Sequence, residues 1–150
     1  MLAVYEPGRS GAATLAEAAR LIERSDAEVT VVTVARQDTD PPRCTVYADA
    51  YNRGVREEAA AELRKASHLL GPLAARARYE LLVEGCDPPL EARAACDFDV
   101  VLLPARRSLY RRGERTGRRL RSSTDAEVRV IAASWRGASR LGPARSALNR

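Results

Sequence analysis

The fold of this chain is indicated most strongly by the run Phe98-Asp99-Val100-Val101-Leu102-Leu103, which passes at Pro104 directly into a basic segment. Between residues 104 and 121 there are eight arginines and one glutamate, a local charge of +7. A short, nearly continuous apolar run is typical of a buried strand in a parallel sheet. In open α/β sheets the carboxyl ends of strands meet the amino ends of helices, and anions bind at that edge. The join at Pro104 therefore predicts such a sheet with a cationic crevice beside it.

The basic character of the chain is confined to two places. The 150-residue chain carries a formal charge of +5, although residues 104–121 alone carry +7 and residues 134–150 add four arginines and no acid. The remainder is therefore net acidic. A chain of this length buries one ordinary hydrophobic core. We expect one folded domain over residues 1–133, followed by a basic, flexible C-terminal tail over residues 134–150.

Five short β-type runs alternate with helical patterns along the chain. The runs cover residues 2–5, 28–34, 79–83, 98–103 and 127–133, and the helical patterns begin at residue 10 or 11 and cover about residues 52–77, 90–95 and 113–122. This alternation favours crossover connections between parallel strands, with helices on both faces of the sheet in three layers. Ser10 is expected to cap the first helix and Asp87 the third. Gly71-Pro72 is a candidate for an early end of the longest helix.

The last strand has the pattern of a sheet edge. Val128, Val130 and Ala132 alternate with two charged residues and an isoleucine, so one face is expected to be less buried than in the fourth strand. An exposed strand edge invites pairing with a second chain. We therefore predict a homodimer that forms through the edge bearing Val128, Val130 and Ala132.

Several classes of function are disfavoured by the composition. The cysteines Cys44, Cys86 and Cys96 lack the CxxC spacing of zinc or redox sites. His68 is the only histidine, and no nucleophile or acid is spaced to form a catalytic set with it. Few aromatic side chains are available for stacking on bases, so nucleic acid is not expected as a partner. No run approaches the roughly 20 apolar residues of a membrane span and no leader pattern begins the chain. These features predict a cytoplasmic protein that is not an enzyme and holds no metal.

Three stretches resemble the universal stress protein family, and the resemblance covers about residues 1–133. Asp97–Leu103 resembles the family's fourth strand, ADLIVVG, and Glu127–Ile131 resembles its closing strand, PVLVV. Val83–Ala92 resembles the third-strand exit, glycine-containing turn and helix start of that family. The resemblance implies an open, Rossmann-like sheet of five parallel strands in the order 3-2-1-4-5, with a crevice between strands one and four. It also implies a stress-response regulatory or binding module.

The ATP motif of that family is degraded in this chain. Members that hold ATP carry G-x2-G-x9-G-[ST] after the fourth strand, and the spacing falls here on Pro104, Arg107, Gly117 and Arg118, with Gly113 as an alternative third position. Proline has no N–H to offer a phosphate, and an arginine obstructs the close backbone approach that glycine permits. The resemblance therefore implies a crevice that does not bind ATP in the usual pose, and no cofactor is expected.

An adenine nucleotide stays the ligand class that the resemblance suggests. The aspartate that contacts adenine in the family is replaced by Glu6, whose longer side chain still accepts a hydrogen bond from an exocyclic amine. The candidate contacts to such a ligand are Glu6, Ser10, Val34, Pro104, Arg106, Arg107, Gly113, Gly117 and Arg118.

The arginine segment after Pro104 leaves three interpretations open. It is a solvated loop ahead of a basic helix face, or an anion site in which Arg106, Arg107, Arg111 or Arg112 replaces the lost glycines with side-chain forks. The third interpretation is a patch for nucleic acid or another polyanion, together with the basic tail. The corresponding alternatives for function are a nucleotide- or phosphate-binding protein with very slow or no hydrolysis, and a polyanion-binding accessory protein.

Overall fold

The computed structural model describes residues 1–36, 45–84, 87–96, 98–105 and 110–133. They form one sheet of five parallel strands in the order β3-β2-β1-β4-β5. The strands are β1 (Leu2–Val4), β2 (Val29–Ala35), β3 (Ala77–Val83), β4 (Val100–Pro104) and β5 (Glu127–Ile131). The predicted class and strand order are thereby confirmed. The predicted tail over residues 134–150 lies outside the described residues, as do Cys44, Cys86, Asp97, Arg106 and Arg107.

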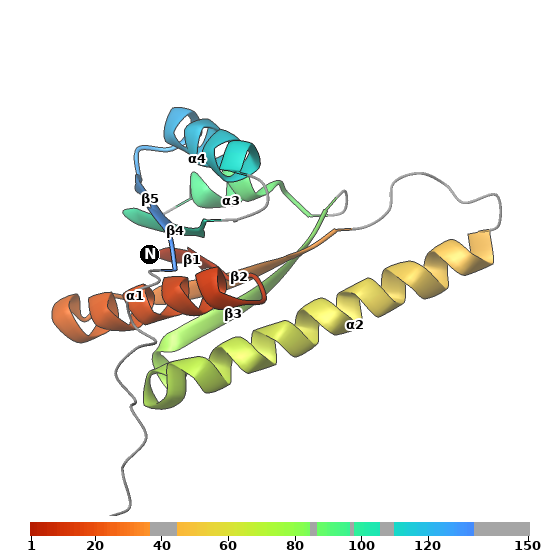
Figure 1. Ribbon diagram of the computed structural model, residues 1–150, viewed down its shortest axis with the longest axis horizontal. Helices are drawn as coiled ribbons and strands as arrows, with labels where there is room; N and C mark the ends of the chain where they lie inside the picture. The colour runs from red at the N-terminus through yellow and green to blue at the C-terminus, as the bar shows by residue number, and fades with distance from the viewer. Residues whose placement is uncertain (37–44, 85–86, 97, 106–109, 134–150) are drawn as a thin grey trace, which may run out of the picture.

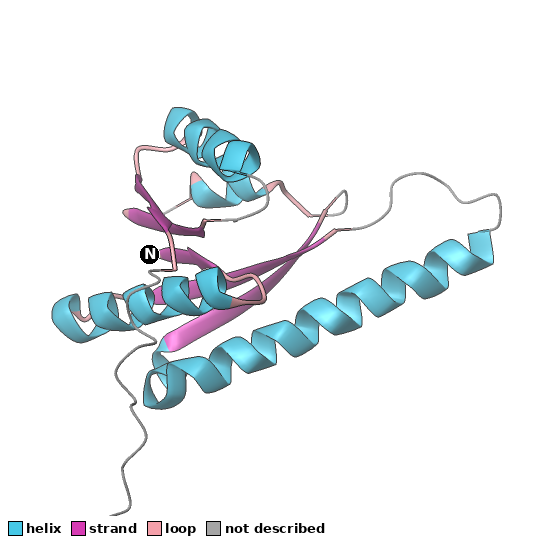
Figure 2. Ribbon diagram, viewed as in Figure 1, coloured by secondary structure: helices cyan, strands magenta, loops and turns pink. Residues whose placement is uncertain are grey.

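Helices cover both faces of the sheet (Figures 1 and 2). They are α1 (Arg9–Ser25), α2 (Thr45–Leu70), a short 3-10 helix η1 (Gly71–Arg76), α3 (Leu90–Ala94) and α4 (Tyr110–Ser123). Helices α1 and α2 lie on one face, and α3 and α4 lie on the other. Within the described ranges, no helix combines the length and the apolar content that a membrane crossing requires.

Alternate residues of each strand point to opposite faces of the sheet. Ala3 and Val31 are fully buried against α1 and α2, whereas their sequence neighbours Leu2 and Val32 are fully buried on the other face. On that second face the core is closed by Leu120 of α4, which is also fully buried. Because successive side chains point to opposite faces, a strand covered on both sides is mostly apolar along its whole length, and Thr30 and Thr33 of β2 are the buried polar exceptions. This requirement explains the continuous apolar runs of the sequence.

The longest helix differs from its predicted range of about 52–77. It begins at Thr45 and ends at Leu70, and the segment 71–76 forms the 3-10 helix instead. Gly71 adopts a left-handed conformation with φ 56°, and Pro72 follows it. The left-handed turn and the missing N–H of proline stop the α-helical hydrogen-bond ladder. The candidate early end at Gly71-Pro72 is therefore confirmed.

Both predicted caps are wrong. The N-cap of α1 is Gly8, at φ 107° and ψ −171°, and no side chain caps the helix. Ser10 lies inside α1, where its carbonyl accepts a hydrogen bond from Thr14 Oγ1 at 2.9 Å. For α3 the N-cap is Pro89, and the carboxylate of Asp87 instead accepts the N–H of Val83 at 2.7 Å. Asp87 thus closes the exit of β3 and does not open α3.

Strand β5 lies at an edge of the sheet, as its alternating pattern predicted. Val128 is 8% exposed and packs into the core beside α4, so its side chain does not face outward as part of the edge. Val130 and Ala132 are exposed. A homodimer through this edge stays a prediction, and Val130 is its best available contact.

Candidate ligand-binding groove

The chain changes direction between β1 and β4, which are neighbours in the sheet. After β1 it crosses to the face covered by α1, and after β4 it crosses to the face covered by α4. Such a switch point leaves a crevice at the carboxyl edge of an open α/β sheet. A groove of about 1470 Å³ lies there. It is lined by the carboxyl ends of β1 to β4, the segments that follow β1 and β3, and residues of α3 and α4.

The floor of the groove is apolar. It includes Val4 of β1, Val34 of β2, Leu82 of β3 and Leu103 of β4, all at or near the carboxyl ends of their strands. Pro104, the last residue of β4, is buried in the same wall. A floor of aliphatic side chains suits the face of a flat ring, because it removes apolar surface from water without demanding a fixed hydrogen bond.

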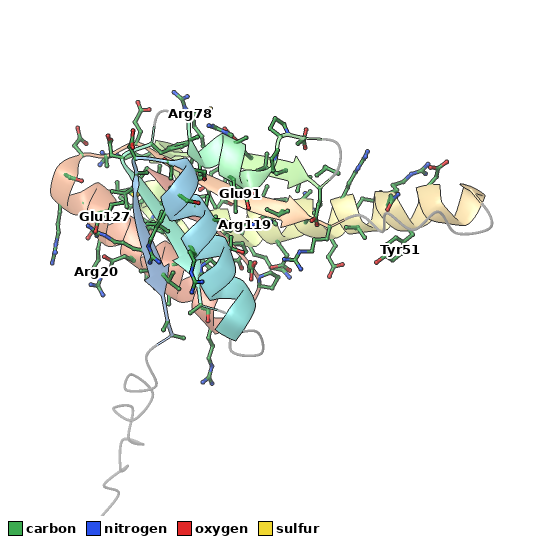
Figure 3. The ribbon with its side chains drawn as sticks, turned by 90° about the horizontal axis from the view of Figure 1, so that it is seen from above. Arg20, Tyr51, Arg78, Glu91, Arg119 and Glu127 are labelled. Atoms are coloured by element: carbon green, nitrogen blue, oxygen red, sulfur yellow. The ribbon has the colours of Figure 1, made fainter. Side chains whose placement is uncertain are left out.

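Charged side chains of both signs line the groove. The acids are Glu6, Glu84, Asp87 and Glu91, and the basic residues are Arg36, Arg118 and Arg119. Arg36 is paired with Glu84, with 4.0 Å between Nε and Oε2. For the Arg118 and Arg119 guanidinium groups, no ion pair is found with the residues that the structure describes. Figure 3 shows Glu91 on α3 and Arg119 on α4, the two neighbouring helices above the groove.

Helix α3, which forms one wall, is held to β3 by a bidentate ion pair. Arg93 Nε and Nη2 donate to the two carboxylate oxygens of Glu80 at 2.8 and 2.7 Å. The hydrogen bonds from Arg93 lower the pKa of Glu80 below its ordinary value of 4.5. The Arg93 guanidinium also stacks over Phe98, 4.7 Å from the ring centre. A five-residue helix has little stability of its own, so these contacts determine where it lies.

We expect Glu80→Gln to lower the free energy of unfolding by about 1 kcal/mol at pH 7. Because the folded-state pKa of Glu80 is depressed, its contribution is present above pH 4.5 and is lost as the pH falls through the folded-state pKa. The difference between wild type and variant should therefore shrink in urea titrations below pH 4.5. The control Glu28→Gln breaks a pair with Arg78 that is largely exposed, and it should change stability little. An equal loss in both variants would contradict the assignment.

The predicted contact residues do not all reach the groove. Glu6, Val34, Pro104 and Arg118 line it, as predicted, whereas Ser10 does not. Gly113 lies within α4 and not in a loop ahead of that helix. Arg106 and Arg107 lie outside the described residues.

Gly117, predicted as a phosphate-binding glycine, lies in the interior of helix α4. It is buried inside α4, and a Cβ added to it would lie 3.4 Å from Val130 Cγ2 and 3.8 Å from Leu103 Cδ1. Both distances are ordinary van der Waals contacts, so a methyl group would fit and the packing does not require glycine at this position. An interior helical residue already uses its N–H within the helix, so this glycine offers no cradle to a phosphate.

The role of Gly11 beside the groove residue Glu6 was not predicted from the sequence. Gly11 is buried in α1, and a Cβ added to it would stand 1.8 Å from the carbonyl oxygen of Glu6. Only glycine therefore allows the turn at Glu6 to fold back on α1. The feature of the sequence that could have indicated this close approach is the pair of glycines, Gly8 and Gly11, shortly after the first strand. Arg119 and Thr116 of α4 were missed as well, because their place above the groove depends on how α4 docks.

The exit of β1 is held in place on both sides. The N–H of Tyr5 donates to the carbonyl of Val32 at 2.8 Å, and Thr33 Oγ1 donates to the carbonyl of Tyr5 at 3.3 Å. The Tyr5 side chain is buried between the sheet and the helices of the opposite face. Burial raises the pKa of Tyr5, and the nearby negative charge of Glu62 raises it further. These contacts fix the backbone from which Glu6 enters the groove.

Comparison with solved structures identifies the fold. A universal stress protein from Archaeoglobus fulgidus aligns with a TM-score of 0.58 at 19% identity, covering 87% of this chain and 90% of the other. A protein of the universal stress protein family from Burkholderia pseudomallei gives 0.56 at 19% identity, covering 87% and 92%. A universal stress protein solved in complex with cAMP gives 0.58 at 14% identity, covering 89% and 96%.

The chain therefore has a universal-stress-protein-like fold, a Rossmann-like α/β sheet with its groove at the switch point. No protein-family model matches its sequence, and no curated protein matches it at a significant level.

Proposed function

We propose that the protein is a regulatory binding module of the universal stress protein type. Its groove takes a small ligand that combines a flat ring with one phosphate, such as a nucleoside monophosphate or a cyclic nucleotide. The observation that carries the proposal is the lining of the groove, which combines apolar strand ends with the carboxylate of Glu6 and the guanidinium groups of Arg118 and Arg119.

Residues of the groove provide a suitable contact for each part of such a ligand. The ring rests on the aliphatic side chains of Val34 and Leu82, and Glu6 accepts a hydrogen bond from an exocyclic amine. Arginine grips phosphate through two parallel N–H donors, and Arg118 and Arg119 are exposed to do so. One structural neighbour was solved with cAMP, a nucleotide with a single phosphate.

A triphosphate in the usual pose is not supported. Pro104 at the end of β4 has no N–H to donate, and Gly117 is packed against Val130 inside α4. The phosphate cradle of backbone N–H groups is therefore replaced by side chains, which suit one phosphate better than three. We propose binding without hydrolysis, because the Ser122 hydroxyl beside Arg118 and Arg119 already donates to the carbonyl of Arg119.

Native mass spectrometry of freshly purified protein tests the proposal directly, because it reads any ligand that co-purifies. Thermal unfolding with added AMP, cAMP and ATP then ranks ligands, since a ligand at 100 times its Kd stabilises the folded state by about 2.7 kcal/mol. AMP or cAMP should raise the melting temperature more than ATP does. Stoichiometric ATP in the purified protein, or no response to any nucleotide, would overturn the proposal.

Arginine variants locate the phosphate. Arg118→Ala and Arg119→Ala should each weaken nucleotide binding about tenfold by isothermal titration calorimetry, because each removes a charged hydrogen-bond donor. Arg20→Ala is the matched control, since Arg20 is an exposed arginine on α1, paired with Glu17 and remote from the groove. Undiminished affinity in the double variant Arg118→Ala/Arg119→Ala would mean that the ligand binds elsewhere.

A further inference from the structure

Thr33 carries a buried hydroxyl beside the groove. It lies between Val32 and Val34 in β2, is 5% exposed and lines the groove. A buried hydroxyl costs free energy unless it has a hydrogen-bond partner, so a threonine among buried valines needs a physical reason. Its Oγ1 donates to the carbonyl oxygen of Tyr5 at 3.3 Å. That carbonyl belongs to the peptide unit between Tyr5 and Glu6, so the hydroxyl contacts the backbone directly before the groove carboxylate.

The Thr33 hydroxyl continues the hydrogen bonding of β1 where the pairing of the strands stops. Pairing between β1 and β2 ends at Val4 and Val32, and the N–H of Tyr5 still donates to the carbonyl of Val32 at 2.8 Å. The carbonyl of Tyr5 then accepts a hydrogen bond from the side chain of Thr33. A valine at position 33 has nearly the same shape but offers no donor. Because a buried carbonyl is unfavourable without a donor, the Thr33 hydroxyl sets the orientation of this peptide unit.

The backbone on either side of this peptide unit is held by other contacts. The carbonyl of Glu6 lies against α1, where a Cβ added to Gly11 would stand 1.8 Å from its oxygen. Pro7 follows Glu6 and restricts it to extended conformations. The Tyr5 side chain is 4% exposed and packs in the core on the α1–α2 face. The peptide unit between Tyr5 and Glu6 differs from its neighbours because a side-chain hydroxyl holds it.

We propose that Thr33 is a positioning residue that determines which ring the groove selects. The inference rests on the proposed function, in which Glu6 accepts a hydrogen bond from an exocyclic amine. The carboxylate of Glu6 meets that amine only if the preceding peptide unit keeps its orientation. A keto oxygen at the same ring position is an acceptor facing an acceptor, and the two repel. Thr33 therefore favours adenine over hypoxanthine by acting through Glu6.

Isothermal titration calorimetry with AMP and IMP measures this selection, because the two ligands share their ribose and phosphate. Wild type should bind AMP more tightly than IMP. Thr33→Val should weaken AMP binding about tenfold and IMP binding less than about twofold, since only AMP loses a charged hydrogen bond. Thr33→Ser restores a hydroxyl and should recover the preference for AMP. A Thr33→Val protein that keeps the full preference would overturn the proposal.

Thr30→Val is the matched control for Thr33→Val. Thr30 is also a buried threonine of β2, at 6% exposure, and it does not line the groove. Both substitutions remove one hydroxyl from the same strand, so a general loss of stability would affect the two proteins alike. Thr30→Val should leave the ratio of AMP to IMP affinity unchanged. If it lowers that ratio as much as Thr33→Val does, Thr33 has no specific positioning role.

Glu6→Ala separates this proposal from the proposed function. It should abolish the preference for AMP, and an unchanged preference would contradict both proposals. If Glu6→Ala loses the preference and Thr33→Val keeps it, the proposed function stands and the positioning role is wrong. In the Glu6→Ala background, adding Thr33→Val should not alter the ratio further, because a positioning residue acts only through Glu6. A further fall would assign Thr33 a direct ligand contact instead.

Amide hydrogen exchange tests the position of the turn in the ligand-free protein. The N–H of Tyr5 is bonded to the carbonyl of Val32, directly before the peptide unit that Thr33 holds. If that unit is released, this N–H should exchange about tenfold faster in Thr33→Val than in Thr30→Val, because local opening becomes easier. Equal exchange in the two variants would rule out the positioning role of Thr33, whatever the groove binds.

Discussion

Replacing Gly11 by alanine is expected to lower the free energy of unfolding by about 3 kcal/mol, a large share of the stability of a small domain. A Cβ at this position would stand 1.8 Å from the carbonyl oxygen of Glu6 and 2.9 Å from its carbonyl carbon. Both atoms belong to the backbone, so no side-chain rotation relieves the clash. The turn that carries Glu6 must move away from α1, and any ligand that Glu6 contacts should be lost with it.

Gly54→Ala is the matched control for Gly11→Ala, because both glycines are helical and only their surroundings differ. Nothing lies within 4 Å of a Cβ added to Gly54. The substitution should raise stability by about 0.5–1 kcal/mol through helix propensity alone. Urea denaturation of both variants, at a dilution where the chain is monomeric, measures the contrast. Equal effects of the two substitutions would show that the approach of Glu6 to α1 is not close.

Leu120→Ala is expected to have the second large effect, a loss of about 2–5 kcal/mol. Leu120 is fully buried and packs in the cluster that includes Leu2, Val101 and Val128, which joins α4 to the sheet. Without it a cavity opens under the helix that carries Arg118 and Arg119. Ligand affinity should therefore fall together with stability, even though Leu120 does not line the groove.

Leu69→Ala provides the comparison for Leu120→Ala. Leu69 is also a helical leucine, but it is 58% exposed. In dilute solution its replacement should change the free energy of unfolding by less than about 0.5 kcal/mol. Thermal and urea unfolding of the two variants give the comparison. If Leu120→Ala were as mild as Leu69→Ala, α4 would not depend on this contact for its position.

The strands could be predicted from the sequence because their signal is local. The run at 98–103 is apolar at five of six positions, and the run at 28–34 is rich in β-branched residues, with four valines and two threonines. Both patterns are typical of strands buried on both faces, and both runs contain strands that lie inside the sheet. The alternation around Val130 likewise identified the edge strand. The order of the strands came from the resemblance to a known family and not from the residues alone, since local patterns contain no information on which strands are neighbours.

The site was predicted less completely, because its residues act through distant contacts. Glu6, Val34, Pro104 and Arg118 line the groove; the first three lie at or just after strand ends, and Arg118 is the last position of the motif spacing. Gly117 lies inside α4 and not ahead of it, because the motif spacing in the sequence does not show that the helix already begins at Tyr110.

By itself, the sequence determined the period of each element, the apolar core and the concentration of arginine beside the fourth strand. These depend on side-chain type and spacing, which are properties of short segments. Only the tertiary structure showed at which position a close backbone approach requires glycine and which arginines line the groove. It also showed how far α2 extends beyond the sheet. Such features depend on distances between segments far apart in the chain. Those distances are established only when the helices pack on the sheet.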